Sequence, residues 1–130
     1  GTDTNEAIKF AKESGVDAIA ISVGNMHLQA KKNAKIDINK IKKIESVTNI
    51  PLVLHGGSGI PSNIRKKISR ITNVAKFNIG TELRILFGNT LRKNIIKNKK
   101  IYDRIGLLQP TVNEMKKFTK KIISNIGPSI

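Results

Sequence analysis

The sequence predicts an α/β fold in which parallel strands alternate with helices. Three apolar stretches, 16–24, 50–54 and 73–79, are bounded by Gly, Asn or Pro, which is typical of short buried strands. The middle stretch is expected to be buried on both faces, as in parallel sheets. Stretches with helical spacing of apolar residues precede, separate and follow the strands. This alternation indicates parallel βαβ units with the helices outside the sheet.

Three strands are too few to close a barrel, and an open sheet of three strands would be unusually small. The sequence begins in a predicted helix rather than in a strand. We therefore favour the last part of a larger barrel over a very small open α/β domain. Residues 1–130, of which 38% are apolar, are expected to belong to one domain with no separate second domain.

Local signals place the first two helices. One is expected over residues 2–14, with Asp3 or Thr4 as its N-cap and Gly15 at its end. Another is expected to begin after Asp37, which can cap it. Its inward face would carry Ile38, Ile41, Ile44 and Val47.

The second half of the chain predicts three more helices. A basic helix begins at Pro61 and Ser62, with Ile64 and Ile68 facing inward. A longer helix follows the third strand, and its inward face would carry Leu83, Leu86, Phe87, Leu91 and Ile95.

The last helix is expected after an irregular basic connection over residues 97–108. Thr111 and Glu114 would form its capping box after Pro110, and Gly127 would end it. Its inward face would carry Val112, Met115, Phe118, Ile122 and Ile126.

The charge balance raises the question of nucleic acid, because 24 Lys and Arg against nine acidic residues give a net charge of +15. The chain is also rich in Ile and Asn, which share AT-rich codons with Lys. One Tyr, four Phe and no Trp leave few side chains for stacking on bases. A biased genome therefore explains the composition better than a nucleic-acid partner does.

The sequence argues against a membrane-spanning protein and against a disulfide-bonded one. No apolar run approaches the roughly 20 residues that span a bilayer, and nothing resembles a signal peptide. Cysteine is absent, which removes disulfides and thiolate metal sites. We expect a cytoplasmic protein with no membrane partner.

Glycines follow the central strand directly, in the stretch 55–59, which reads His-Gly-Gly-Ser-Gly. Glycine lets backbone N–H groups approach an anion closely, and the helix near Ser62 adds the positive end of its dipole. Two interpretations stay open, a phosphate site and a turn that binds nothing.

The two histidines of the chain, His27 and His55, each lie just beyond a predicted strand. Neighbouring parallel strands lie about 4.8 Å apart, so both imidazoles could bind one zinc ion. The alternative is that each is a loop residue with a satisfied hydrogen bond. Zinc usually has a third protein ligand, and none is evident in the sequence.

Further polar candidates follow the third strand. Asn78, Gly80 and Thr81 could offer a substrate an amide, a close backbone approach and a hydroxyl, although Asn in loops and Thr at N-caps are common. Lys31 and Arg84 are candidate phosphate-binding cations, in a chain where basic residues are abundant.

Residues 16–27, 51–59 and 76–84 together resemble the last three strand ends of class II fructose-bisphosphate and tagatose-bisphosphate aldolases. The resemblance extends over nearly the whole chain, including Thr2 and Asp3 before the first helix. It implies strands 6 to 8 of a (β/α)8 TIM barrel with their helices and the C-terminal helices.

The resemblance also implies a zinc-dependent lyase of glycolysis and related carbohydrate metabolism. Such an enzyme reversibly cleaves a ketose 1,6-bisphosphate, with fructose bisphosphate as the first candidate, into dihydroxyacetone phosphate and an aldehyde. Zinc would be held by His27, His55 and a third histidine upstream, with a monovalent cation, Na⁺ or K⁺, in the same loops. The phosphosugar would be bound by Lys31, Gly56, Gly57, Ser58, Asn78, Gly80, Thr81 and Arg84. The family is dimeric or larger, which implies a dimer or tetramer.

Three positions depart from the family pattern: Leu28 stands in place of Gly, Ala30 in place of Tyr, and Gly80 in place of Asp or Ala. The family's catalytic Asp, in a His-x-Asp-His motif, lies on an earlier strand outside this sequence, so the chain alone is expected to be inactive. The alternatives are a noncatalytic, phosphate-binding aldolase remnant and a small basic nucleic-acid-binding module.

Overall fold

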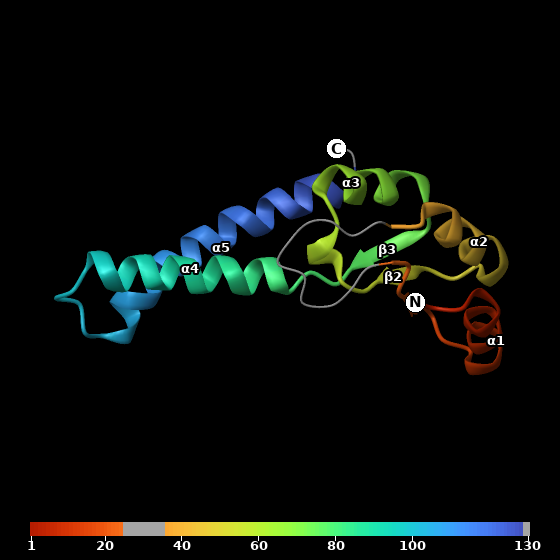
Figure 1. The fold of residues 1–130 in the computed structure, drawn as a ribbon, viewed down its shortest axis with the longest axis horizontal. Helices are drawn as coiled ribbons and strands as arrows, with labels where there is room; N and C mark the ends of the chain where they lie inside the picture. Colours follow the sequence, from red (N-terminus) through yellow and green to blue (C-terminus); the bar gives the residue numbers. More distant parts are fainter. Residues whose placement is uncertain (25–35, 129–130) are drawn as a thin grey trace. The chain divides into compact units, whose positions relative to one another are not determined.

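A computed structural model describes residues 1–24 and 36–128, which fall into two compact units. The first unit, Gly1–Gly80, contains the sheet and three helices, and the second, Thr81–Ile130, contains two long helices (Figure 1). Within these described ranges no helix is long and apolar enough to span a membrane.

The first unit alternates helices and strands as predicted. Its three strands form one parallel sheet in the order β1-β2-β3, which confirms the α/β class. The strands are shorter than the apolar stretches, because pairing between strands rather than composition sets their length. The elements are α1 (Thr4–Ser14), β1 (Ile19–Ile21), α2 (Ile38–Thr48), β2 (Leu52–Leu54), the 3-10 turn η1 (Gly57–Gly59), α3 (Ser62–Ile71) and β3 (Val74–Phe77).

One face of the sheet carries the hydrophobic core. Side chains that alternate along the strands point into it, and they pack with inward residues of the helices. The fully buried members are Ile21, Val23, Ile41, Ile44, Leu52, Leu54, Ile60 and Ile68. Deeply buried Ile and Leu side chains each contribute roughly 1.5–3 kcal/mol to folding.

The opposite face of the sheet is open within the described residues. Ala20 is paired with Val53, and Val53 with Lys76, in one row across the strands. Ala20 and Lys76 are exposed and Val53 is half-buried. The expectation that β2 is buried on both faces is therefore wrong for the described chain, because its helices cover only one face.

The predicted caps are confirmed in the first two helices. The Asp3 Oδ1 accepts hydrogen bonds from the backbone N–H groups of Asn5, at 2.9 Å, and Glu6, at 3.1 Å. Asp37 accepts in the same way from Lys40, at 2.9 Å. Gly15 ends α1 with φ 64°, a left-handed conformation that glycine adopts without strain.

The inward face of α2 is narrower than predicted. Ile41 and Ile44 are fully buried, but Val47 is 42% exposed. Steps of three residues each fall about 60° short of a full helical turn, so Val47 is rotated by about 120° from Ile41. The prediction for Val47 is wrong for this reason.

The second unit pairs α4 (Thr81–Lys97) with α5 (Arg104–Ile126). The predicted irregular connection over residues 97–108 is confirmed only for residues 98–103, and the prediction that the last helix starts at Thr111 is wrong. Asp103 caps α5 by accepting from the Gly106 N–H at 2.8 Å. The helix then continues through Pro110, so that Thr111 is a buried residue within it rather than its cap.

Asn94 of α4 explains how α5 tolerates a proline. Pro110 has no N–H, so the Gly106 carbonyl four residues earlier loses its normal donor. The Asn94 Nδ2 donates to the carbonyls of Gly106, at 3.2 Å, and Leu107, at 2.7 Å. Asn94 is buried, and it replaces the missing helical hydrogen bonding from the neighbouring helix.

Burial in this helix pair differs from the predicted faces. Phe87, Ile95 and Val112 are 38%, 47% and 55% exposed, so their predicted inward positions are wrong. The buried face of α4 includes the polar Asn94, whereas the neighbouring Ile95 is exposed. The spacing of apolar residues cannot predict that a polar residue is buried in place of an apolar one.

We expect the Asn94→Ala variant to lose roughly 1–2 kcal/mol of unfolding free energy, because the half-buried carbonyls of Gly106 and Leu107 lose the donor that Asn94 supplies. Denaturant unfolding would measure this loss. Asn89→Ala on the exposed surface of the same helix is the matched control and should change stability little. Equal losses in the two variants would contradict the bridging role.

A pH-dependent prediction follows from the first cap. The backbone N–H groups of Glu6 and Asn5 hold the pKa of the Asp3 carboxyl below its ordinary value. A pKa lowered by folding stabilises the fold above the unfolded-state pKa, and this contribution disappears as pH falls through the folded-state pKa. Asp3→Asn keeps the cap but removes the charge. Its urea midpoint should lie below wild type at pH 7 and converge with it in acid, and a difference in midpoint that does not change with pH would contradict the prediction.

Candidate active site

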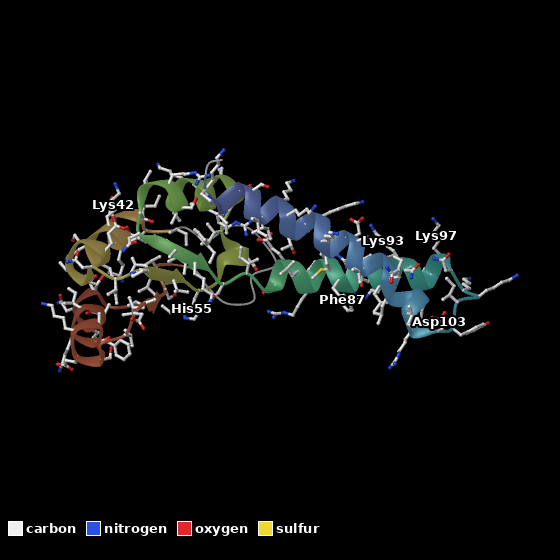
Figure 2. The ribbon with its side chains drawn as sticks, turned by 180° about the vertical axis from the view of Figure 1, so that it is seen from behind. Lys42, His55, Phe87, Lys93, Lys97 and Asp103 are labelled. Atoms are coloured by element: carbon white, nitrogen blue, oxygen red, sulfur yellow. The ribbon has the colours of Figure 1, made fainter. Side chains whose placement is uncertain are left out.

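His55 directly follows β2 at the carboxyl end of the sheet (Figure 2). Its backbone N–H donates to the Ile21 carbonyl at the end of β1, at 3.2 Å. On the other side of β2, the Asn78 N–H donates to the Leu54 carbonyl at 2.8 Å. Parallel pairing thus brings the carboxyl ends of the three strands together around His55. The sequence predicts this edge as the place for a ligand, because ligands bind at the carboxyl ends of strands in α/β sheets.

The side chains of His55 and Asn78 lie within hydrogen-bonding distance of each other. The Asn78 Nδ2 is 3.4 Å from the His55 Nδ1, and both residues are half-buried. In this arrangement the Asn78 amide N–H can donate to the Nδ1 lone pair, so that the contact orients the imidazole ring. Asn78 therefore contacts the imidazole of His55 directly.

The glycine loop is packed tightly against β3. The Gly57 N–H donates to the Asn78 carbonyl at 3.0 Å. A Cβ on Gly57 would lie 3.0 Å from that oxygen and 3.0 Å from the Ile79 Cγ1, so only glycine fits without movement. Gly56 adopts a left-handed conformation with φ 61°, which also favours glycine.

Hydrogen bonds inside the loop set which of its groups face outward. The Gly59 N–H donates to the Gly56 carbonyl at 3.0 Å, and the Ile60 N–H donates to the Gly57 carbonyl at 3.2 Å. The Gly57 N–H is used by Asn78, so Gly57 shapes the loop in this structure instead of presenting an N–H to a ligand. Ser58 is buried.

Arg65, which sequence reasoning missed, lies behind the loop. It is 3% exposed, and its Nη1 donates to the Gly57 carbonyl at 3.4 Å. It lies one residue from Ile64 and three from Ile68, on the inward side of α3. A basic residue at an inward position of an otherwise exposed basic helix was the signal that could have revealed it.

The other predicted site residues that follow β3 lie at the boundary between the two units. Gly80 ends the first unit, and Thr81 and Arg84 open α4. The Arg84 Nη2 donates to the Thr81 Oγ1 at 3.3 Å, and the Arg84 side chain is exposed.

The predicted residues His27 and Lys31, and the departures Leu28 and Ala30, lie outside the described residues. Among residues 1–24 and 36–128 no three His, Cys, Asp or Glu side chains gather as a metal site would require. The described part thus offers one imidazole, His55, whose donor chemistry suits zinc. A complete zinc site needs ligands beyond it.

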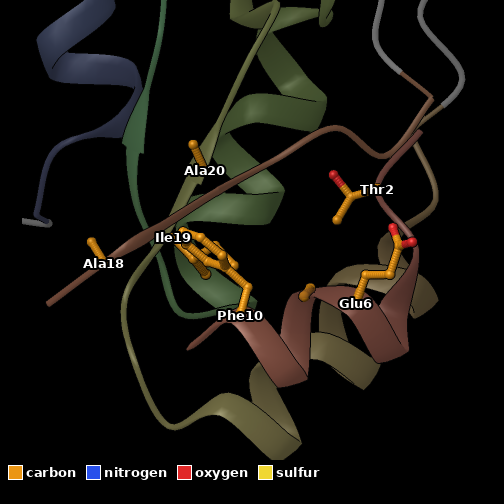
Figure 3. A pocket seen from close by; sticks show the side chains of 7 residues that line it. Thr2, Glu6, Phe10, Ala18, Ile19 and Ala20 are labelled. Atoms are coloured by element: carbon orange, nitrogen blue, oxygen red, sulfur yellow. The ribbon is translucent and has the colours of Figure 1, made fainter. Parts of the chain in front are cut away.

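A cavity of about 340 Å³ lies elsewhere, between α1 and β1 (Figure 3). It is lined by Thr2, Glu6, Ala7, Phe10, Ala18, Ile19 and Ala20. Its one charged lining group is the Glu6 carboxylate, and it has no imidazole or cation. Such a lining does not suit a phosphate, so this cavity is distinct from the strand-end site.

Comparisons with known proteins agree with this arrangement. The family model of class-II fructose-bisphosphate aldolase matches residues 1–129. The chain belongs to the class II fructose-bisphosphate aldolase family. The resemblance found in the sequence is therefore confirmed.

Two solved structures with aldolase in their descriptions share the fold of this chain. The crystal structure of the YdjI aldolase from Escherichia coli K12 matches with a TM-score of 0.76 and 25% identity over 97% of this chain. A structure from Coccidioides immitis, provisionally assigned as a fructose-1,6-biphosphate aldolase, matches with a TM-score of 0.75 and 24% identity over 96% of this chain. This chain covers 44% and 42% of those two chains, so it spans less than half the length of these aldolases.

Substitution of Gly57 tests the close packing of the loop. Gly57→Ala should destabilise the fold by about 1–3 kcal/mol, because the added methyl group meets the Asn78 carbonyl and the Ile79 side chain directly after β3. The matched control is Gly88→Ala in α4, where the nearest atom belongs to the flexible Arg92 side chain. Alanine there should be neutral or stabilising by up to about 1 kcal/mol. Thermal unfolding of both variants gives the comparison, and an unchanged Gly57→Ala midpoint would contradict the packing.

Proposed function

We propose that this chain forms part of the active site of a zinc-dependent class II aldolase. The complete enzyme would reversibly cleave a ketose 1,6-bisphosphate, with fructose bisphosphate as the first candidate, into dihydroxyacetone phosphate and an aldehyde. The observation that carries the proposal is the convergence of His55, Asn78 and the glycine loop at one end of a parallel sheet. We further propose a cytoplasmic dimer or tetramer.

His55 and His27 would hold the zinc ion together with a third histidine from outside this sequence. When bound, zinc supplies Lewis-acid polarisation of the substrate's ketone carbonyl. Asn78 would hold the His55 imidazole in one orientation through the 3.4 Å contact with Nδ1, as groups around metal ligands commonly do. Asn78 would also face the substrate near its carbonyl carbon.

The glycine loop would bind a phosphate of the substrate. Gly56, Gly57 and Ser58 shape a turn that precedes the N-terminus of α3, where backbone dipoles favour an anion. The family resemblance implies that Gly80, Thr81, Lys31 and Arg84 would complete the phosphosugar contacts. A Na⁺ or K⁺ ion would be held by backbone carbonyls of the same loops.

Proton transfer during cleavage is assigned to the family's Asp in the His-x-Asp-His motif, outside this sequence. The residues of this chain would therefore bind and orient the substrate, which lowers the barrier by fixing the reacting geometry. The chain tested without that segment should bind ligands weakly and show no lyase activity.

The His55→Ala variant of the complete enzyme tests the metal assignment. We expect loss of bound zinc and a fall in kcat/KM larger than the roughly 10- to 100-fold typical of residues that only support a metal ligand. Zinc content and cleavage of fructose and tagatose bisphosphates are the measurements, with exposed Lys67→Ala as the control. Full activity of His55→Ala would exclude His55 as a ligand. A complete wild-type protein that binds phosphate but cleaves neither sugar would favour the noncatalytic alternative.

A further inference from the structure

We propose that Arg65 is a positioning residue of the phosphate loop, which it fixes from behind through the Gly57 carbonyl. This inference rests on the proposed function, in which the loop binds a phosphate of the substrate. It adds a basic residue outside the set that sequence reasoning assigned to the site.

The first support is the way in which the Gly57 peptide is held. The Gly57 carbonyl accepts from the Arg65 Nη1, at 3.4 Å, and from the Ile60 N–H, at 3.2 Å. The Gly57 N–H donates to Asn78 at 3.0 Å. Arg65 is therefore the one side chain among these contacts, and it links α3 to the loop and, through Gly57, to the residue beside His55.

The second support is the burial of the charge. Arg65 is 3% exposed and carries a guanidinium group. Burying such a charge costs free energy unless nearby groups compensate. Charges in a buried setting are also screened less by solvent and salt than surface charges. A fixed cation behind the loop would therefore strengthen its attraction for a dianionic phosphate.

The third support is the contrast with the other cations of α3. Lys66, Lys67 and Arg70 belong to the same basic helix, but all three are exposed. Their charges act through solvent and are worth little individually. Position 65 is thus distinguished from its neighbours by contact and burial, and not by charge alone.

The test uses the complete enzyme with Arg65→Met, Arg65→Lys and the matched exposed control Lys66→Met. We expect Arg65→Met to raise the inhibition constant of inorganic phosphate and the KM of the bisphosphate by about tenfold, the value of one charge-assisted hydrogen bond. The kcat should fall less than KM rises, and Arg65→Lys should restore part of the affinity. Lys66→Met should leave both constants within about twofold of wild type. Equal phosphate inhibition of wild type and Arg65→Met would overturn the inference.

A second measurement covers the case in which Arg65→Met does not fold. The Arg65 Nε–H signal of the wild-type protein, assigned by its loss in Arg65→Lys, is followed by NMR while inorganic phosphate is added. A saturable shift supports the inference, and an unmoved signal overturns it.

The two proposals fail in different ways. A wild-type enzyme that cleaves no ketose bisphosphate, but whose Arg65 signal responds to phosphate, would overturn the proposed function and leave the role of Arg65 standing. An active enzyme with unchanged phosphate inhibition in Arg65→Met would overturn the role of Arg65 alone.

Discussion

The close approach of Gly57 to the end of β3 is the contact on which the candidate site depends. A backbone hydrogen bond of 3.0 Å joins Gly57 to Asn78, and there is no room for a side chain between them. This contact places the glycine loop beside the same residue whose amide meets the His55 imidazole. One backbone position therefore sets the distance between the candidate phosphate loop and the candidate metal ligand.

Much of the fold could be predicted because its signals are local. The caps at Asp3 and Asp37 and the helix end at Gly15 depend on residues within one turn of each other, and the short apolar strands alternate with helices in chain order. The cap of α5 at Asp103 is also a local signal, but the continuation of this helix past a proline could not be predicted in this way. Its passage through Pro110 depends on Asn94 of another helix, and a proline without such a partner normally ends a helix.

In the candidate site, too, residues with a local signal could be predicted and residues that depend on tertiary contacts could not. His55 and the glycine loop were found because their residue types and their place after a strand carry chemical meaning on their own. Arg65 was missed because its role comes from burial and from contact with Gly57, whereas its sequence neighbours are ordinary exposed lysines. The contact of Asn78 with His55 was also outside the reach of sequence, since it depends on the register that joins β2 to β3.

Because β2 lies between β1 and β3, the hydrogen bonds at its end couple the opening of all three strand ends. His55 is bonded to β1 through the Ile21 carbonyl, and Asn78 of the β3 end is bonded to β2 through the Leu54 carbonyl. Neither partner strand can separate without releasing a bond at this end of β2. Local opening at the strand ends should therefore disturb the imidazole and the loop together, so that the site opens as a single unit of native-state hydrogen exchange rather than residue by residue.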